Sequence, residues 1–270
     1  MSKEDMLISS MQNPRVKQVV KLRKQSERKR SGVTIIEGYR EILRALENKW
    51  PTQTLFYCRA LFLGENEDQL MEDCRSRGAK VFECSENVFR KMSYRDRPDG
   101  LIALAPIVQK KLEDLELSEN PLILVAEHLE KPGNLGTLLR SADAAGVEAV
   151  IVCDKCTDIN NPNVVRASIG TLFYIPIAEA TTEETIAFLR EKNVQILSAT
   201  PHATAEYFDV DMKTPTAIVV GAEQFGLSDR FMQESDLNVR IPMLGKNDSL
   251  NVSTAATILL YEAVRQRRVG

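Results

Sequence analysis

Short apolar runs alternate with segments of helical period along the second half of the chain. The runs have the length and composition of buried strands, and they lie at residues 122–126, 149–152, 194–197, 217–220 and 239–241. They are separated by loops and by segments with helical spacing of apolar residues, such as Leu135, Leu138, Leu139 and Ala142. Strands that alternate with helices predict a mostly parallel α/β sheet covered on both faces.

The first hundred residues show a similar alternation on a smaller scale. Strands are predicted at 33–36, 61–63, 81–82 and 101–104, with helices between them, which indicates a small α/β sandwich. Between Pro106 and Pro121 the apolar density falls and charged residues accumulate, so a domain boundary is predicted there. The predicted organisation is a first domain at 1–106, a linker at 107–120 and a second domain at 121–270.

Composition places the chain among globular proteins without a strong overall charge. Its 270 residues are 43% hydrophobic and 27% charged, which excludes a disordered chain. The 35 basic and 38 acidic side chains leave a net charge of −3, so contact with nucleic acid would need a local basic patch. The longest apolar runs are far shorter than the roughly 20 residues of a membrane span, and the start lacks a secretory pattern. We therefore expect a cytoplasmic protein with no membrane partner.

One such basic patch is present between residues 15 and 30. The segment has a single acidic residue, Glu27, among the basic side chains of Arg15, Lys17, Lys21, Arg23, Lys24, Arg28, Lys29 and Arg30. Such a density of positive charge predicts contact with the phosphates of a nucleic acid. The alternative is an ordinary solvated helix face.

Open parallel sheets bind ligands in the loops beyond the carboxyl ends of their strands, and three such loops carry polar residues. The first, residues 130–146, begins a helix on which Arg140 projects away from the apolar stripe, one turn after Gly136. Residues 132–134 predict a helix start with an amide-bearing cap. This loop by itself is also compatible with a plain helix start and a solvated arginine.

The other two loops follow the strands at 217–220 and 239–241. In the second, Gly221 and Gly226 flank Glu223, a spacing that fits neither a dinucleotide fingerprint nor a P-loop. Gly221 suits backbone approach to a planar ligand, while Glu223 is either an anion with a partner or a surface turn residue. The third loop ends in two possible helix caps, Ser249 and Asn251, of which capping would need only one.

Metal and hydrolase chemistry have little support in the sequence. Cys153 and Cys156 have the spacing of metal ligands, but no second pair accompanies them, and a zinc site needs four ligands. The five cysteines are scattered, which favours reduced thiols. His128 and His202 are isolated, and no Ser-His-Asp or Cys-His pattern is present. We therefore expect no metal.

Taken together, the three loops resemble the three motifs of the SpoU (TrmH) branch of the SPOUT superfamily of RNA methyltransferases. The resemblance is carried by Asn134-x-Gly136-x-x-x-Arg140, by Gly221-x-Glu223-x-x-Gly226, and by Ile241-Pro242-Met243 followed by Ser249-Leu250-Asn251-Val252. Residues 8–14, 36–40 and 98–101 look like the substrate-binding domain of the same family. Lys131 and Phe225 depart from the family pattern. The resemblance implies a carboxy-terminal domain with a trefoil knot, an exception to the usual rule for chain connections.

The resemblance also implies a cofactor, a substrate and an assembly. S-adenosyl-L-methionine would be held by Gly221, Ile241, Met243, Leu250 and Val252, and the catalytic or substrate positions would be Asn134, Arg140, Glu223, Ser249 and Asn251. Arg166 resembles a substrate-side arginine of the ribosomal RNA enzymes, and Arg40 lies in the matching amino-terminal motif. The predicted RNA-binding residues are Arg15, Lys17, Arg23, Lys24, Arg40 and Arg166. A homodimer would form through the helices that contain 135–142 and 252–263.

The predicted activity is methyl transfer to a ribose 2′-hydroxyl of RNA, in the first place ribosomal RNA because of the extra amino-terminal domain. The methyl group of a sulfonium is already activated, so positioning and a fixed cation suffice, and Arg140 is assigned that electrostatic role. Proposals for the family make this arginine the proton acceptor, but a guanidinium has a pKa above about 12. The alternatives are a transfer-RNA 2′-O-methyltransferase and a non-catalytic RNA-binding protein that keeps the fold.

Overall fold

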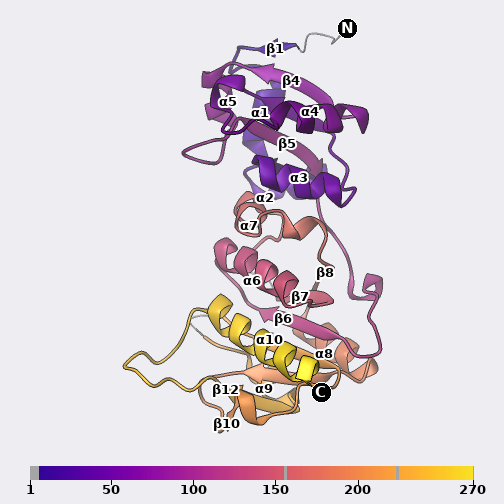
Figure 1. The fold of residues 1–270 in the computed structure, drawn as a ribbon, viewed down its shortest axis with the longest axis vertical. Coiled ribbons are helices and arrows are strands. Elements are labelled where there is room, and N and C mark those ends of the chain that lie inside the picture. The colour runs from indigo at the N-terminus through magenta and orange to yellow at the C-terminus, as the bar shows by residue number, and fades with distance from the viewer. Residues whose placement is uncertain (1–5, 155–156, 223–224, 270) are drawn as a thin grey trace. The chain divides into compact units, whose positions relative to one another are not determined.

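The computed structural model describes residues 6–154, 157–222 and 225–269, which form two compact units (Figure 1). The first unit comprises the residues up to Val108 together with 158–174, and the second comprises 109–157 together with the residues from Ile175 onward. The segment expected to be a linker is partly folded: Leu115 is buried in the core of the second unit.

The first unit is a five-stranded mixed sheet with helices on both faces. Its elements are β1 (Leu7–Ile8), α1 (Pro14–Lys21), α2 (Gln25–Ser31), β2 (Val33–Glu37), α3 (Tyr39–Glu47), β3 (Thr54–Tyr57), α4 (Glu67–Ser76), β4 (Lys80–Cys84), α5 (Glu86–Met92), β5 (Leu101–Pro106) and α7 (Pro162–Ala167). The strand order is β1-β4-β3-β5-β2, and β5 runs antiparallel to both of its neighbours. The predicted α/β class of this half is confirmed.

Alternation along the strands sorts the apolar side chains onto the two faces of this sheet. Ile35, Phe56 and Ile102 belong to one buried cluster with residues of α1 and α5, whereas the adjacent Ile36 and Leu55 are buried outside that cluster. A period of two is what a sheet covered on both faces requires.

The strand predicted at 61–63 is wrong. Leu61 ends a short 3₁₀ helix, Arg59–Leu61, and Leu63 is 82% exposed. The strand lies earlier, at β3, where Leu55, Phe56 and Tyr57 are buried and pair with both β4 and β5. Three consecutive apolar residues are too few to distinguish a strand from a turn whose first residue reaches the core.

Residues 158–174 are separated in sequence from the rest of the first unit but are anchored in it by polar contacts. Arg28, only 2% exposed, forms an ion pair of 2.6 Å with Asp158. The hydroxyl of Thr34 donates to the carbonyl of Asn160 at 2.9 Å, and the Asn160 side chain accepts from the amide of Val108 at 2.7 Å. These bonds use buried groups, so the segment is an integral part of the unit.

Gly170, at the end of this segment, packs against α3. Its φ is +79°, and an added Cβ would lie 3.1 Å from the carbonyl oxygen of Glu41 and 3.2 Å from the Cβ of Arg44. We expect Gly170→Ala to lower the free energy of unfolding by about 2 kcal/mol or more, because it adds left-handed strain and a close contact. Urea denaturation measures this. Gly78→Ala is the matched control, since Gly78 has φ +91° but open space around it. If the free energy of unfolding falls as much in this variant as in Gly170→Ala, the close contact with α3 does not contribute to the effect.

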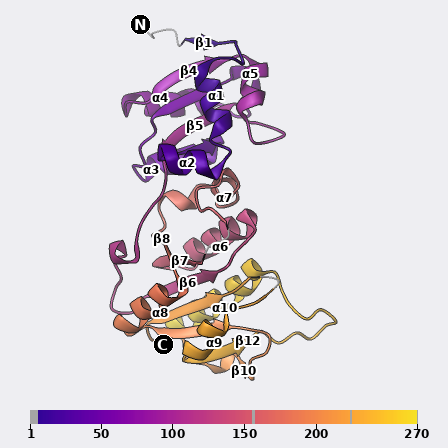
Figure 2. The same cartoon turned by 180° about the vertical axis from the view of Figure 1, so that it is seen from behind.

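The second unit is a parallel sheet, as predicted, and it has seven strands where the sequence indicated five. Its strands follow the order β10-β12-β9-β11-β6-β7-β8, and every pairing is parallel. Its elements are β6 (Leu122–Glu127), α6 (Pro132–Ala144), β7 (Ala149–Cys153), β8 (Ile177–Ala180), α8 (Thr182–Glu191), β9 (Gln195–Ala199), β10 (Ala205–Glu206), β11 (Thr216–Val220), α9 (Asp229–Glu234), β12 (Leu237–Arg240) and α10 (Val252–Val269). Helices α6 and α10 cover one face, while α8 and α9 cover the other (Figures 1 and 2). The trefoil knot stays a prediction.

The order of the strands locates the place where a ligand would bind. From β6 the chain continues on one side through β7 and β8, then crosses to β9, β11 and β12 on the other side. Such a reversal leaves a crevice at the carboxyl ends of the strands beside it, here β6 and β11. Within the part of the chain that the structure describes, no helix is long and apolar enough to cross a membrane.

Candidate active site

The loop after β6 leads directly into α6. Lys131 stands at the N-cap without a side-chain cap bond, and Pro132 occupies the first turn. Asn134 is therefore inside the first turn, so its predicted role as the cap of α6 is wrong. Gly136 and the apolar residues of the stripe are buried. Arg140 is exposed, and its side chain forms no hydrogen bond or ion pair with any residue that the structure describes.

The loop after β11 makes a tight turn that depends on its two glycines. Gly226, at φ +69°, pairs with Ala222 and donates its amide to the Ala222 carbonyl at 2.9 Å. A Cβ on Gly221 would collide with the carbonyl group of Gly226 and lie 2.6 Å from the amide nitrogen of Leu227. Only glycine fits at 221. Glu223, the acidic residue predicted here, lies outside the described residues.

The first and third loops meet through hydrogen bonds between asparagines and a serine. The Asn251 side chain accepts from the amide of Ser253 at 3.0 Å, which caps α10, and donates to the side-chain oxygen of Asn134 at 3.3 Å. The Ser253 hydroxyl donates to the backbone carbonyl of Asn134 at 3.0 Å. Asn251 thus serves both as a cap and as a tether to α6, whereas the exposed Ser249 bonds to its neighbour Asp248 at 3.2 Å.

The contact between the helices continues along their length. The hydroxyls of Ser141 and Thr257 are 2.7 Å apart, and the Tyr261 hydroxyl lies 3.5 Å from the carbonyl of Ala144. Together with the bonds of Asn134, these contacts show that α6 and α10 lie side by side. The first turns of both helices, which carry residues of the first and third motifs, are therefore next to each other.

The backbone between β12 and α10 is open. Among the described residues, none forms a backbone hydrogen bond with the main chain of residues 241–250. Ile241 and Met243 are half-buried, Leu250 is 38% exposed and Val252 is buried. The loop therefore combines partly covered apolar side chains with backbone donors and acceptors that the sheet does not use, which suits a ligand with a flat ring and polar edges.

Glu127 is a buried carboxylate that the sequence reasoning missed. It is 0% exposed at the end of β6, and its oxygens accept from the Thr182 hydroxyl at 2.8 Å and from both the amide and the hydroxyl of Ser228 at 2.7 Å. Ser228 is also the N-cap of α9. Glu127 therefore fastens the end of the Gly221–Ser228 loop to β6. The signal was an acidic residue that ends an otherwise wholly apolar strand.

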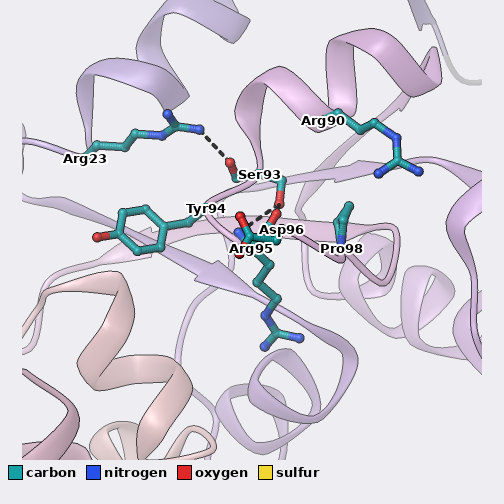
Figure 3. Close-up of a pocket in the computed structure, with 7 residues that line it drawn as sticks. All are labelled: Arg23, Arg90, Ser93, Tyr94, Arg95, Asp96 and Pro98. Atoms are coloured by element: carbon teal, nitrogen blue, oxygen red, sulfur yellow. Dashed lines mark hydrogen bonds between the residues drawn. The ribbon is translucent and has the colours of Figure 1, made fainter.

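The basic residues predicted to bind RNA lie in the first unit. Lys17 and Lys24 are exposed, and the exposed Arg15 lies over the ring of Phe82 at 4.5 Å. Arg23 lines a cavity of about 410 Å³ and donates to the carbonyl of Ser93, just after α5 (Figure 3). It also donates to the carbonyl of Lys91. Its guanidinium is thus partly engaged in holding α5.

Arg28 does not belong to the exposed basic surface that the sequence predicts. Its buried guanidinium donates to the carbonyls of Leu22 and Arg23 and to the carboxylate of Asp158. A charge that is 2% exposed cannot meet a phosphate in solution. Arg28 is a structural residue.

Arg40 and Arg166, which are far apart in sequence, line one cavity of about 640 Å³ in the first unit. Arg40 lies in the first turn of α3 and Arg166 in the last turn of α7, and both are exposed. The sequence could not have paired them, because the pairing depends on the attachment of residues 158–174 to this unit.

Cysteine and metal chemistry are not built into the described part of the molecule. No group of three or more His, Cys, Asp or Glu residues suited to a metal occurs in that part. Cys58, Cys74, Cys84 and Cys153 are buried free thiols, and burial raises the pKa of Cys153 to about 12. Cys156, the partner of Cys153 in the metal-like spacing, lies outside the described residues.

Comparison with known proteins identifies matches to both halves of the chain. Residues 121–261 match the SpoU rRNA Methylase family, and residues 13–103 match the MRM3-like substrate binding domain. The chain is 30% identical to the 23S rRNA (uridine(2479)-2′-O)-methyltransferase of Streptomyces viridochromogenes, over 91% of this chain and 87% of that protein. It is 28% identical to the 23S rRNA (guanosine(2553)-2′-O)-methyltransferase RlmP of Bacillus subtilis, over 94% and 97%. The AdoMet-bound rRNA methyltransferase of Sinorhizobium meliloti superposes with a TM-score of 0.89 at 31% identity, over 97% and 98% of the two chains.

Proposed function

The chain belongs to the SpoU rRNA Methylase family, and on that premise we propose that it transfers a methyl group from S-adenosyl-L-methionine to a ribose 2′-hydroxyl of ribosomal RNA. The observation that carries the proposal is the hydrogen bond that joins the first and third motifs through Asn134 and Asn251, while the second motif follows β11, the strand next to β6. The described residues of all three motifs thus follow the carboxyl ends of strands of one parallel sheet, where such sheets bind ligands.

The residues at this edge fit the cofactor. The unused backbone groups of residues 241–250 can bond to the edge of an adenine, and Ile241 and Met243 offer apolar surface for its ring. The glycine at 221 lets the main chain of the second loop turn sharply without a side chain in the way. Leu250 and Val252 complete the apolar set. We assign Gly221, Ile241, Met243, Leu250 and Val252 to cofactor binding.

The bound cofactor supplies a methyl group on a positively charged sulfur, which is already activated for attack. The protein must then position the ribose hydroxyl and stabilise its developing negative charge. Arg140 can do the second task, because its exposed guanidinium has no carboxylate partner among the described residues. A guanidinium keeps its proton in proteins, so we assign Arg140 electrostatic stabilisation and not proton removal.

The remaining polar residues of the motifs position the reacting groups. Asn134 and Asn251 are hydrogen-bonded to each other, so both side chains are held in a restrained orientation. Ser249, in the exposed part of the third loop, is proposed to contact the substrate. Glu223 keeps its proposed catalytic or substrate role on the family motif alone.

Ribosomal RNA is the substrate class best supported. The two relatives named above act on 23S ribosomal RNA, and the amino-terminal half matches a substrate-binding domain. Lys17 and Lys24 offer exposed positive charge on α1 and before α2, to which Arg15 and Arg23 add. The two relatives methylate different bases, so the target nucleotide does not transfer to this chain.

Incubation of the purified chain with tritiated S-adenosylmethionine and 23S ribosomal RNA transcribed in vitro tests the proposal directly. The expected result is incorporation into the RNA at one ribose, located by mass spectrometry of nuclease fragments. A parallel reaction with transfer RNA tests the alternative substrate, because a transfer-RNA methyltransferase would incorporate the label there and not into ribosomal RNA. Cofactor binding by calorimetry without incorporation into either RNA would instead favour a non-catalytic protein that keeps the fold.

We further propose that the chain forms a homodimer through α6 and α10 and acts in the cytoplasm. The apolar stripe of α6 is buried within its own unit, so a partner would have to contact other positions, such as Tyr261, which is 48% exposed on α10. Sedimentation of the full chain distinguishes a dimer from a monomer.

A further inference from the structure

The cavity that contains Arg40 and Arg166 has features that the proposed reaction does not use. It is enclosed by the first turn of α3, the loop at 63–67, the 95–99 turn and the end of α7, all within the first unit. Its volume of about 640 Å³ lies in the range of small-molecule sites in proteins.

Two of the acidic side chains beneath the cavity are paired with one arginine, and a third is buried and bonded to the main chain. Arg95 forms ion pairs of 2.6 Å with Glu41 and 3.3 Å with Asp99, and Asp99 also accepts from the amide of Tyr39 at 3.0 Å. Glu67 is 4% exposed and accepts from the amide of Gly64 at 2.8 Å. Of the carboxylates that line the cavity, only that of Glu65 is exposed to solvent.

The same buried network leaves hydrogen-bonding capacity unused. The Nε of Arg95 and one carboxylate oxygen of Asp99 are buried without a partner in the described structure. A donor and an acceptor left over in two neighbouring residues are costly unless something else satisfies them. Both residues line the cavity.

The rim carries the opposite charge. Arg40 and Arg166 are exposed, and neither guanidinium forms a hydrogen bond or ion pair with another described residue. Two guanidiniums that face one cavity without a carboxylate partner favour an anion with several oxygens, such as a phosphate. Beside them lie the ring of Tyr39 and the side chain of Leu63, which is 82% exposed.

The position of Arg166 is maintained by a strained turn. Ile169 has φ +51°, a rare conformation for a β-branched residue, and it also lines the cavity. Its carbonyl accepts from Arg44 of α3 at 3.2 Å, and the adjacent Gly170 packs against the same helix. Strain of this kind persists where the surroundings impose it, often at binding sites.

We propose that this cavity binds a single nucleotide of the RNA substrate, with its phosphate held by Arg40 and Arg166 and its base placed against Tyr39 and Leu63. The proposal rests on the proposed function, and it adds the substrate contact that the first unit makes. An unpaired nucleotide fits because a base in a duplex cannot leave its stack to enter a pocket without an additional cost.

Filter binding of the full chain to 23S ribosomal RNA transcribed in vitro, at several salt concentrations, tests the proposal. Arg40→Ala and Arg166→Ala should each weaken binding about tenfold and lower the salt slope by about one. Because both side chains hold one phosphate, the double variant should lose clearly less than the product of the single losses. Leu63→Glu should weaken binding as well. Arg75→Ala, which removes the same charge from α4 outside the cavity, is the control and should change affinity little.

The outcomes separate this proposal from the proposed function. Unchanged affinity and salt slope in both arginine variants would overturn the cavity proposal, as would strictly multiplicative losses, which indicate two independent contacts. Calorimetry with S-adenosylmethionine on each variant shows whether the fold and the cofactor site are retained. If the unaltered chain binds 23S ribosomal RNA through the cavity but never methylates RNA, the proposed function fails and the cavity proposal stands.

Discussion

Arg140→Ala is expected to lower the rate of methyl transfer to ribosomal RNA by about a thousandfold or more, with little change in affinity for S-adenosylmethionine. The reason is that a fixed positive charge near the attacking oxygen stabilises the transition state more than the ground state. Arg140 is exposed on α6, away from the buried stripe of Leu135, Leu138 and Leu139, so the substitution leaves the packing of the helix intact. Single-turnover methylation and calorimetry measure the two quantities.

Arg140→Lys is the matched variant for this experiment. It keeps the charge but loses the planar fork of donors, so it should recover only part of the rate. Full activity in the alanine variant would exclude the electrostatic role. A rate that rises with pH in the unaltered chain, and loses this rise only when Arg140 is replaced, would instead support the role of proton acceptor.

Glu127→Ala is expected to destabilise the second unit by about 3 kcal/mol and to weaken binding of S-adenosylmethionine about tenfold. The substitution leaves the Thr182 hydroxyl and the amide and hydroxyl of Ser228 without their shared acceptor. It also frees the end of the loop that begins at Gly221. Urea denaturation gives the stability and calorimetry gives the affinity.

Two smaller changes resolve the contribution of the loop. Ser228→Ala removes one hydroxyl from the cluster and should cost about 1 kcal/mol. Glu127→Gln keeps the shape but turns an amide group toward the Ser228 amide, so its effect should lie between the two. If the Glu127→Ala variant keeps full affinity for S-adenosylmethionine at a temperature where it is folded, the hydrogen bonds of Glu127 stabilise the sheet but do not shape the cofactor site.

Several features of the site could be predicted because they are local. The glycines of the second loop reflect a turn of a few residues, and at Gly221 no Cβ fits. The exposed position of Arg140 follows from the period of the helix alone. In contrast, the double role of Asn251 as cap and tether joins positions 117 residues apart, and no pattern along the chain relates them.

Buried charges were the main source of error. In the sequence Arg28 cannot be distinguished from its basic neighbours, but it forms an ion pair with Asp158, 130 residues away, and is buried. Glu127 follows the apolar residues of a strand in the sequence, but it accepts hydrogen bonds from the starts of two later helices, α8 and α9. A charged residue enters a core only when its partners are present, and those partners come from distant segments.

By itself, the sequence determined the parallel sheet of the second unit, the small α/β sandwich of the first and the family, because strand length, side-chain period and motif spacing are properties of short segments. Only the tertiary structure decided that residues 158–174 pack into the first unit, that Arg166 shares a cavity with Arg40, and that Glu127 holds the second loop. These depend on contacts between segments far apart along the chain, whose free energy is gained only when the whole unit has folded.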